Sequence, residues 1–168
     1  MDRYRNKRRE KDISKVLVTY FSVSGTTETV AKALAESIGA DLFEIVPERP
    51  YSSGDVNWMN PLSRCNKEKL GKKDVPVAGH VENMADYDVL LVGFPIWYGC
   101  APNVVNTFLK GYDLSGKKIA AFATSGGSGI GKTAEKLRPY TPGADVVDAV
   151  LFSGADPEEL KNWAEGII

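Results

Sequence analysis

Five short apolar runs constrain the fold of this 168-residue chain more than any other feature. They are rich in Val, Leu, Ile and Phe, and they span Lys15 to Phe21, Asp41 to Val46, Tyr87 to Phe94, Lys118 to Thr124 and Val146 to Phe152. Nearly continuous hydrophobic runs of this length are typical of strands that are buried on both faces of a parallel sheet. The sequence therefore predicts five buried strands.

Helical patterns separate most of these runs. Apolar residues recur at helical spacing in two stripes, Val30, Leu34 and Ile38, and Val104, Val105, Phe108 and Leu109. Strands that alternate with helices imply right-handed crossovers and a parallel sheet. The predicted fold class is therefore α/β, with a doubly wound, five-stranded parallel sheet, helices on both faces and a three-layer sandwich. We expect a single domain over residues 15–168, after a basic, disordered tail over residues 1–14.

The last helix carries the clearest signals. Asp156 is a candidate N-cap, Pro157 suits the first helical position, and the two glutamates that follow favour the helix dipole. Its predicted buried face consists of Leu160, Trp163, Ala164 and Ile167.

One connection departs from this alternation. Pro47 to Asp86 contains several Gly, Pro and Asn residues and only a short helical candidate, Asn66 to Leu70. A connection of this length is usually functional or poorly ordered. Ligands of doubly wound folds bind beyond the carboxyl ends of the strands, at the topological switch point.

Charge and composition exclude several classes of protein. The first 15 residues hold seven Lys or Arg against three Asp or Glu, whereas the whole chain has a net charge of -1, so the remainder is mildly acidic. A nucleic-acid binder needs a basic face, so we expect no nucleic-acid partner. No apolar run approaches the about 20 residues of a membrane span, and the basic tail lacks the apolar segment of a signal peptide. We expect a cytoplasmic protein.

The cysteines and the histidine favour neither a metal site nor a disulfide framework. Cys65 and Cys100 form no CxxC pair, and His80 is the only histidine. Cys100 stands just before a predicted helix start, where the helix dipole would favour a thiolate. The alternative is a small core residue, which is the commoner role of an isolated cysteine.

A hydroxyl-rich turn follows the first predicted strand and opens a helix. It reads Ser22-Val23-Ser24-Gly25-Thr26-Thr27. Hydroxyls and a glycine in this position let successive backbone N–H groups converge on an anion, and the helix N-terminus adds partial positive charge. The turn is predicted to hold a phosphate monoester without a lysine or a metal. The alternative is an ordinary polar turn whose hydroxyls cap the helix.

Two further loops follow predicted strands and therefore share the same edge of the sheet. The third strand ends in a loop fixed by proline and glycine that carries the adjacent aromatic residues Trp97 and Tyr98, on which a flat ring could stack. The alternative is that these rings merely close the end of the sheet. The fourth strand ends in a segment from Thr124 to Gly131 whose four glycines allow close backbone approach to a ligand.

These three loops, in this order, resemble those of the flavodoxin-like FMN-binding family, and within it the short-chain branch with a G-x-P-I-W-x-G loop. The resemblance covers Val16 to Ile168. It implies an FMN cofactor whose phosphate is held by Ser22, Ser24, Gly25, Thr26 and Thr27. It places Pro95, Ile96, Trp97, Tyr98 and Gly99 along the isoalloxazine ring, and Ser125, Gly126, Gly127 and Ser128 at its pyrimidine edge.

The chain also departs from the family pattern. Archetypal flavodoxins supply a second stacking tyrosine from the loop after the fourth strand, where this chain has Ser and Gly. One flavin face is therefore either open or covered by Tyr51, Trp58 or Met59 from the long connection.

The resemblance implies a protein that carries electrons between redox partner proteins or to a small-molecule acceptor. None of the three loops holds a group of acid, base and nucleophile side chains that could act together, so we expect no catalytic residue. The sequence leaves the oligomeric state open. One alternative is an FMN-dependent oxidoreductase that passes electrons from NAD(P)H to a quinone-like acceptor. Another is a non-redox FMN-binding module.

A competing motif overlaps the third loop. Gly126 to Thr133 reads G-x-x-x-x-G-K-T, the pattern of a nucleoside triphosphate P-loop, between a predicted strand and a predicted helix. The loop follows the fourth strand rather than opening the domain, and no strand with a magnesium-binding Asp follows it. We therefore expect Lys132 to be a solvated helix residue.

Overall fold

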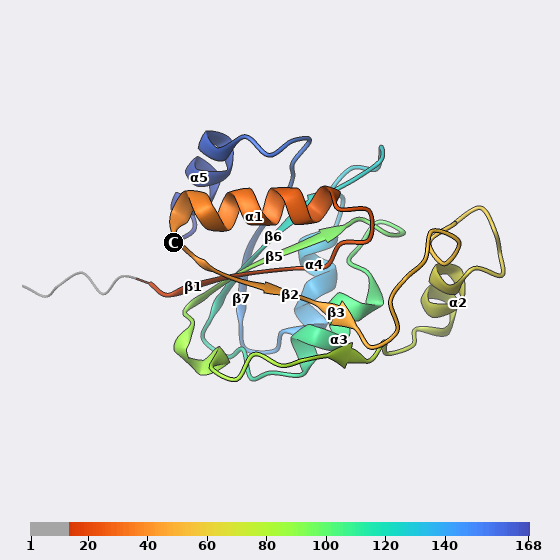
Figure 1. Ribbon diagram of the computed structural model, residues 1–168. Helices are drawn as coiled ribbons and strands as arrows, with labels where there is room; N and C mark the ends of the chain where they lie inside the picture. Colours follow the sequence, from red (N-terminus) through yellow and green to blue (C-terminus); the bar gives the residue numbers. More distant parts are fainter. Residues whose placement is uncertain (1–13) are drawn as a thin grey trace, which may run out of the picture.

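The computed structural model describes residues 14–168, so the basic tail expected over residues 1–14 lies almost entirely outside the described residues. At the centre is a five-stranded sheet in the order β2-β1-β5-β6-β7, in which every neighbouring pair is parallel (Figure 1). The strands are β1 (Val16–Tyr20), β2 (Asp41–Glu44), β5 (Val89–Pro95), β6 (Lys118–Thr124) and β7 (Asp145–Leu151). The predicted doubly wound α/β fold is confirmed.

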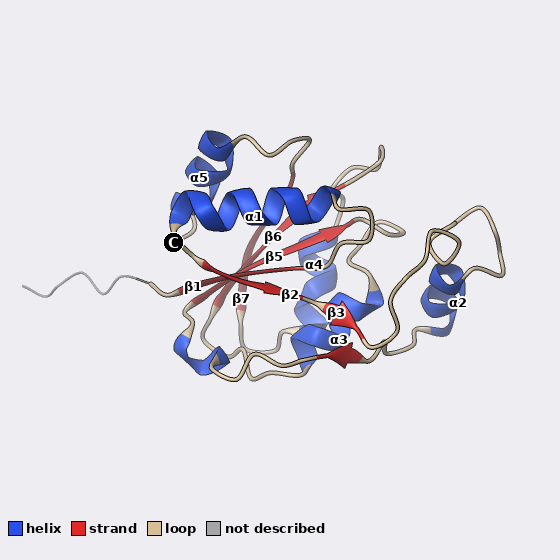
Figure 2. Ribbon diagram, viewed as in Figure 1, coloured by secondary structure: helices blue, strands red, loops and turns tan. Residues whose placement is uncertain are grey.

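Helices cover both faces of the sheet (Figure 2). One face packs against α1 (Thr26–Ile38) and α5 (Pro157–Glu165), and the other packs against α3 (Asn103–Lys110) and α4 (Thr133–Leu137). Successive strand residues point to opposite faces, so Leu90 belongs to the α3 and α4 side of the core and Leu91 to the α1 and α5 side. Both are fully buried, as the apolar runs predict.

The caps and the helical stripes agree with the sequence. The Asp156 carboxylate accepts a hydrogen bond from the Glu158 backbone N–H at 3.0 Å, which confirms the predicted N-cap of α5. The stripe on α3 is buried throughout, whereas Ile38 at the end of α1 and Trp163 on α5 are only partly buried.

The second predicted strand is shorter than its apolar run. β2 ends at Glu44, and the chain then forms β3 (Val46–Pro47), which pairs antiparallel with β4 (Val77–Ala78) in a separate two-stranded sheet. β2 and β7 are the two edge strands, each with one neighbour, and most of their side chains are exposed or half-buried, so burial on both faces is wrong for both of these runs. Pro47 also lacks the N–H that a longer ladder would need.

The long connection forms an arm, residues 48–76, that extends beyond the sheet and carries α2 (Arg64–Gly71) (Figure 1). Side-chain contacts hold it together. The Arg64 guanidinium lies 3.8 Å from the centre of the Tyr51 ring, its Nε donates to Glu68 Oε1 at 2.7 Å, and the Tyr51 hydroxyl donates to Glu68 Oε2 at 2.5 Å. α2 confirms the short helix predicted over Asn66 to Leu70 and is longer than that prediction at both ends.

Two short 3-10 helices, η1 (Met84–Asp86) and η2 (Arg138–Tyr140), complete the described elements. No helix within residues 14–168 combines the length and the apolar character that crossing a membrane requires.

Candidate functional site

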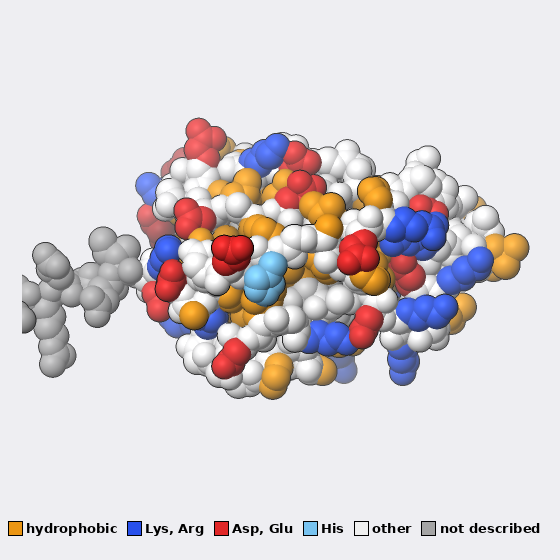
Figure 3. Space-filling model, turned by 60° about the horizontal axis from the view of Figure 1, so that its bottom comes forward, with side chains coloured by type: hydrophobic (Ala, Val, Ile, Leu, Met, Phe, Trp, Pro, Cys, Tyr) orange, Lys and Arg blue, Asp and Glu red, His pale blue; other side chains and the backbone are white. Residues whose placement is uncertain are grey.

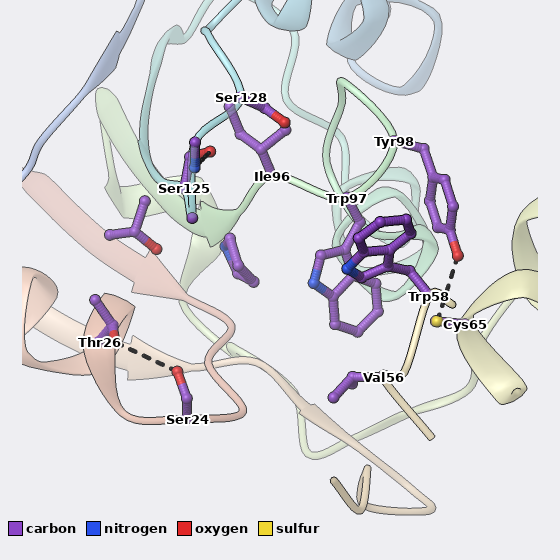
Figure 4. Close-up of a pocket in the computed structure, with 14 residues that line it drawn as sticks. Ser24, Thr26, Val56, Trp58, Cys65, Ile96, Trp97, Tyr98, Ser125 and Ser128 are labelled. Atoms are coloured by element: carbon purple, nitrogen blue, oxygen red, sulfur yellow. Dashed lines mark hydrogen bonds between the residues drawn. The ribbon is translucent and has the colours of Figure 1, made fainter. Parts of the chain in front are cut away.

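The three predicted loops meet at the carboxyl edge of β1, β5 and β6, where they surround a cavity of about 730 Å³, here called the edge cavity. In Figure 4 the hydroxyls of Ser24 and Thr26 lie on one side of it and the rings of Trp58, Trp97 and Tyr98 on the other. Its walls are formed by Ser24, Thr26, Val56, Trp58, Cys65, Pro95, Ile96, Trp97, Tyr98, Thr124, Ser125, Gly126, Gly127 and Ser128. Most of the predicted site residues are therefore brought together, and Ser22, Gly25, Thr27 and Gly99 stand outside the lining.

The hydroxyl-rich turn leaves the N-terminus of α1 without a side-chain cap. Gly25 occupies the N-cap position with a left-handed φ of 92°, a conformation that glycine adopts without steric cost. Its N–H donates to Ser22 Oγ at 3.1 Å, so Ser22 shapes the turn from behind. Because no side chain caps the helix, the N–H groups of its first turn are open to an anion. The capping alternative is not what the structure shows.

Thr27 lies beneath the cavity and not in its wall. Its side chain is 1% exposed, and its hydroxyl is 2.7 Å from the hydroxyl of Thr124 at the end of β6. That hydroxyl is therefore already paired inside the protein. The part of Thr27 that can reach an anion is its backbone N–H in the first turn of α1.

A tight turn carries the two aromatic residues. The N–H of Trp97 donates to the carbonyl of Cys100 at 3.0 Å, and the N–H of Cys100 donates to the carbonyl of Trp97 at 3.2 Å. Between them, Tyr98 and Gly99 both have left-handed φ, 55° and 73°. Positive φ at both central residues defines a type I′ turn, and a tyrosine is strained there. We call residues 97–100 the aromatic turn.

Other aromatic rings fix Trp97 from outside the cavity. The Phe21 and Tyr51 rings make edge contacts with Trp97, with centroids 5.5 and 5.3 Å away. Tyr51 therefore supports the stacking residue and does not line the cavity.

Tyr98 joins the aromatic turn to the arm. Its hydroxyl donates to the Asn66 side-chain carbonyl on α2 and lies 3.4 Å from Cys65 Sγ (Figure 4). Partial desolvation of the hydroxyl, together with the neighbouring Cys65 thiol, raises the pKa of Tyr98 well above its usual value. The hydroxyl consequently stays protonated and keeps donating to Asn66.

The arm supplies the part of the site that sequence reasoning largely missed. Val56, Trp58 and Cys65 line the edge cavity, and Trp58 is 71% exposed. Of the three candidates to cover an open flavin face, Trp58 is the one at the cavity, whereas Met59 lies on the surface away from the lining. Thr124 was also missed, although it directly precedes the predicted Ser125.

The loop after β6, residues 125–131, here called the glycine loop, leaves space beside its glycines. A Cβ placed on Gly126 or Gly129 would meet no atom within 4 Å, and the N–H of Gly127 donates to Ser125 Oγ at 3.1 Å. The loop backbone thus borders open space, and its residues 125–128 line the edge cavity, which suits close approach by a ligand edge.

The P-loop alternative finds no support in the geometry. Lys132 is exposed, as predicted for a solvated residue, and the Thr133 side chain is fully buried, with its hydroxyl donating to the carbonyl of Ile130. A P-loop needs that hydroxyl for magnesium. The helix that follows has only five residues.

The edge cavity is uncharged. None of its lining residues is Asp, Glu, Lys, Arg or His, and within residues 14–168 no group of three His, Cys, Asp or Glu side chains is placed to bind a metal. The other cysteine, Cys100, is the last residue of the aromatic turn and is buried, and the Lys69 ammonium donates to its sulfur at 2.9 Å.

A doubly wound sheet with a ligand-sized cavity at its switch point defines a class of nucleotide- and flavin-binding proteins. The flavodoxin family model matches residues 15–167, and the chain belongs to this family. It is 39% identical to a protein described as a flavoprotein from Bacteroides eggerthii, with a TM-score of 0.86, covering 92% of this chain and 98% of that one.

Two further solved structures are similar. A protein described as a flavoprotein from Bacteroides uniformis is 36% identical, with a TM-score of 0.85, covering 90% of this chain and 98% of the other. A flavoprotein from Lactobacillus acidophilus, solved in complex with FMN, shares the fold at 24% identity and a TM-score of 0.67, covering 90% and 99% of the two chains.

Proposed function

We propose that the protein binds FMN in the edge cavity and carries electrons between redox partners. The observation that supports this most strongly is the pairing of an uncapped helix N-terminus with a facing aromatic wall in one cavity of about 730 Å³. Volumes of about 300–1,000 Å³ are usual for ligand sites. The FMN complex of the Lactobacillus relative adds support at the level of the fold.

The residues present fit the two parts of FMN. Ser24 and Thr26, with the first-turn N–H groups of α1, would hold the phosphate, since a hydroxyl-rich helix N-terminus neutralises an anion without a cation. Trp97 and Trp58 offer flat apolar surfaces for the ring, and the loop over residues 125–128 offers backbone groups to its polar edge. FMN supplies the electron transfer when bound, while the protein sets its orientation and its electrostatic surroundings.

The lining supports a carrier rather than a self-sufficient enzyme. No carboxylate, imidazole or ammonium group lines the cavity to take or give a proton during turnover. Trp58 and Tyr98 are exposed at its wall, so a partner can approach the ring region. We expect redox partner proteins or a small-molecule acceptor, and the two free cysteines of the described residues suit the reducing cytoplasm.

The visible spectrum of the purified protein, before and after addition of FMN, tests cofactor binding. We expect the absorption bands of a bound flavin. A second assay follows oxidation of NADH or NADPH with a quinone and no added protein. The carrier proposal expects negligible turnover, and rapid turnover would assign the FMN-dependent reductase instead.

A further inference from the structure

A second cavity lies on the other side of the aromatic turn. It has a volume of about 310 Å³ and is bounded by the end of α2, the start of α3 and the helix α4. Cys100 and Leu137 form part of its wall, and four lysines surround it: Lys69, Lys72, Lys73 and Lys136. We call it the basic cavity. Figure 3 shows Lys and Arg side chains gathered over the part of the molecule where α2 lies.

The positive charge of the basic cavity is not neutralised by the protein. Within residues 14–168 none of these four lysines has a carboxylate within 4 Å. The one acidic residue in the wall, Asp74, is engaged by Lys110 at 2.5 Å. Four ammonium groups around one concavity repel each other, and a bound anion would relieve that repulsion.

The lysines are carried by anchored backbone. The Asn103 side-chain amide, at the start of α3, donates to the carbonyls of Glu68 at 2.9 Å and Lys73 at 3.0 Å. These two bonds fix the lysine-bearing end of α2 against α3. The backbone that carries Lys69, Lys72 and Lys73 is therefore held in place relative to α3.

We propose that the basic cavity binds a small molecule with two phosphate groups. A single phosphate dianion neutralises two ammonium groups, whereas this cavity presents four. Lys69 lies in α2, Lys72 and Lys73 directly follow it, and Lys136 lies in α4. The charges therefore come from two separate segments, and two linked anionic centres match them better than one. Lysine suits phosphate as a compact point charge. The site is separate from the edge cavity and does not depend on flavin binding.

The cavity also touches the back of the aromatic turn. Lys136 Nζ is 3.4 Å from the carbonyl of Gly99, and Lys69 Nζ is 2.9 Å from Cys100 Sγ. An anion that attracts these two ammonium groups would move them relative to Gly99 and Cys100, and so would change the chemical environment of both residues. Their backbone amide resonances are therefore the expected NMR reporters of occupancy.

Titration calorimetry of the FMN-saturated protein with inorganic pyrophosphate tests the proposal, because bound FMN would occupy the hydroxyl-rich turn of the edge cavity. We expect saturable one-to-one binding and amide shifts centred on residues 99 and 100. The double variant Lys69→Gln with Lys136→Gln should weaken binding about a hundredfold, because each of the two lost charge-assisted contacts is expected to contribute about tenfold. The matched control, Lys67→Gln with Lys132→Gln, removes the same charge from α2 and the N-cap of α4, outside the lining, and should stay within about twofold of the native protein.

Three further comparisons separate specific binding in the basic cavity from other sources of the signal. The Ser24→Ala, Thr26→Ala variant should bind pyrophosphate normally, which separates this site from the edge cavity. Tighter binding of ADP than of pyrophosphate would identify the source as a nucleoside diphosphate, and the reverse would identify free pyrophosphate. Equal losses in both lysine double variants, non-saturable binding, or equal affinity for citrate would show diffuse charge attraction and overturn the proposal.

Discussion

The hydroxyls of Thr27 and Thr124 lie 2.7 Å apart beneath the edge cavity, 97 residues apart in sequence. Thr27 is in the first turn of α1 and Thr124 ends β6, so this buried hydrogen bond ties the helix that would hold a phosphate to the strand that leads into the glycine loop. Its function is to position the two walls of the cavity relative to each other.

A double-mutant cycle tests this tie. Thr27→Val or Thr124→Val alone leaves the other hydroxyl buried without a partner, and each should lower the free energy of unfolding by about 1–3 kcal/mol. The double variant removes both hydroxyls and should recover part of that loss. Urea denaturation provides the measurement, and strictly additive losses would show that the two hydroxyls do not interact.

The hydroxyls of Ser24 and Thr26 in the hydroxyl-rich turn should contribute more to FMN affinity than the Lys132 ammonium does. Ser24→Ala with Thr26→Ala should weaken FMN binding by about 1.5–3 kcal/mol for each lost charge-assisted hydrogen bond. Lys132→Ala should leave the affinity nearly unchanged, since this side chain is exposed and outside the cavity. Dissociation constants ranked in the opposite order would revive the nucleotide-binding alternative.

Trp97 should be the residue that stacks closest to the flavin. Rings of Phe21 and Tyr51 hold it in place, whereas the Tyr98 hydroxyl is directed to α2. Bound FMN fluorescence should therefore be strongly quenched, and Trp97→Ala should restore emission and loosen binding. If Tyr98→Ala restores it and Trp97→Ala does not, the stacking residue is Tyr98.

The uncharged lining should make the second electron easier to add than in a flavin site crowded with carboxylates. One partly buried negative charge at about 8 Å contributes about 2 kcal/mol, or about 90 mV for one electron. Ser128→Asp should accordingly make the second one-electron potential more negative, and Ser128→Asn serves as its neutral control. A stepwise reductive titration that shows no shift between these variants would contradict this electrostatic argument.

The order of strands and helices could be predicted because it depends on local apolar runs. Leu90, Leu91 and their neighbours are buried on both faces, and that burial leaves a direct trace in the sequence. The positions of the three loops follow, since parallel strands end at one edge. The sequence also predicts that one face of the flavin ring is either open or covered by the long connection. That prediction depended on residue types alone, since Ser and Gly stand where other flavodoxins have a stacking tyrosine.

The arm and the aromatic turn could not be predicted in detail. The arm has little periodicity, and its shape depends on the contacts that join Tyr51 to Arg64 and to Glu68, which is 17 residues further along the chain. The position of Trp58 depends on that shape. A left-handed Tyr98 contradicts its intrinsic preference, so no local rule predicts the turn that directs its hydroxyl to Asn66.

The most direct test of the account is a titration of flavin-free protein with FMN, riboflavin and FAD, followed by flavin fluorescence. The account predicts saturable one-to-one binding of FMN and much weaker binding of riboflavin, which lacks the phosphate that the α1 N-terminus would hold. Weaker binding of FAD than of FMN is also expected, because its flavin phosphate is joined to AMP through an anhydride bond and is no longer a free monoester. Equal affinity for FMN and riboflavin, or no binding of FMN, would contradict the claim that the edge cavity is an FMN site.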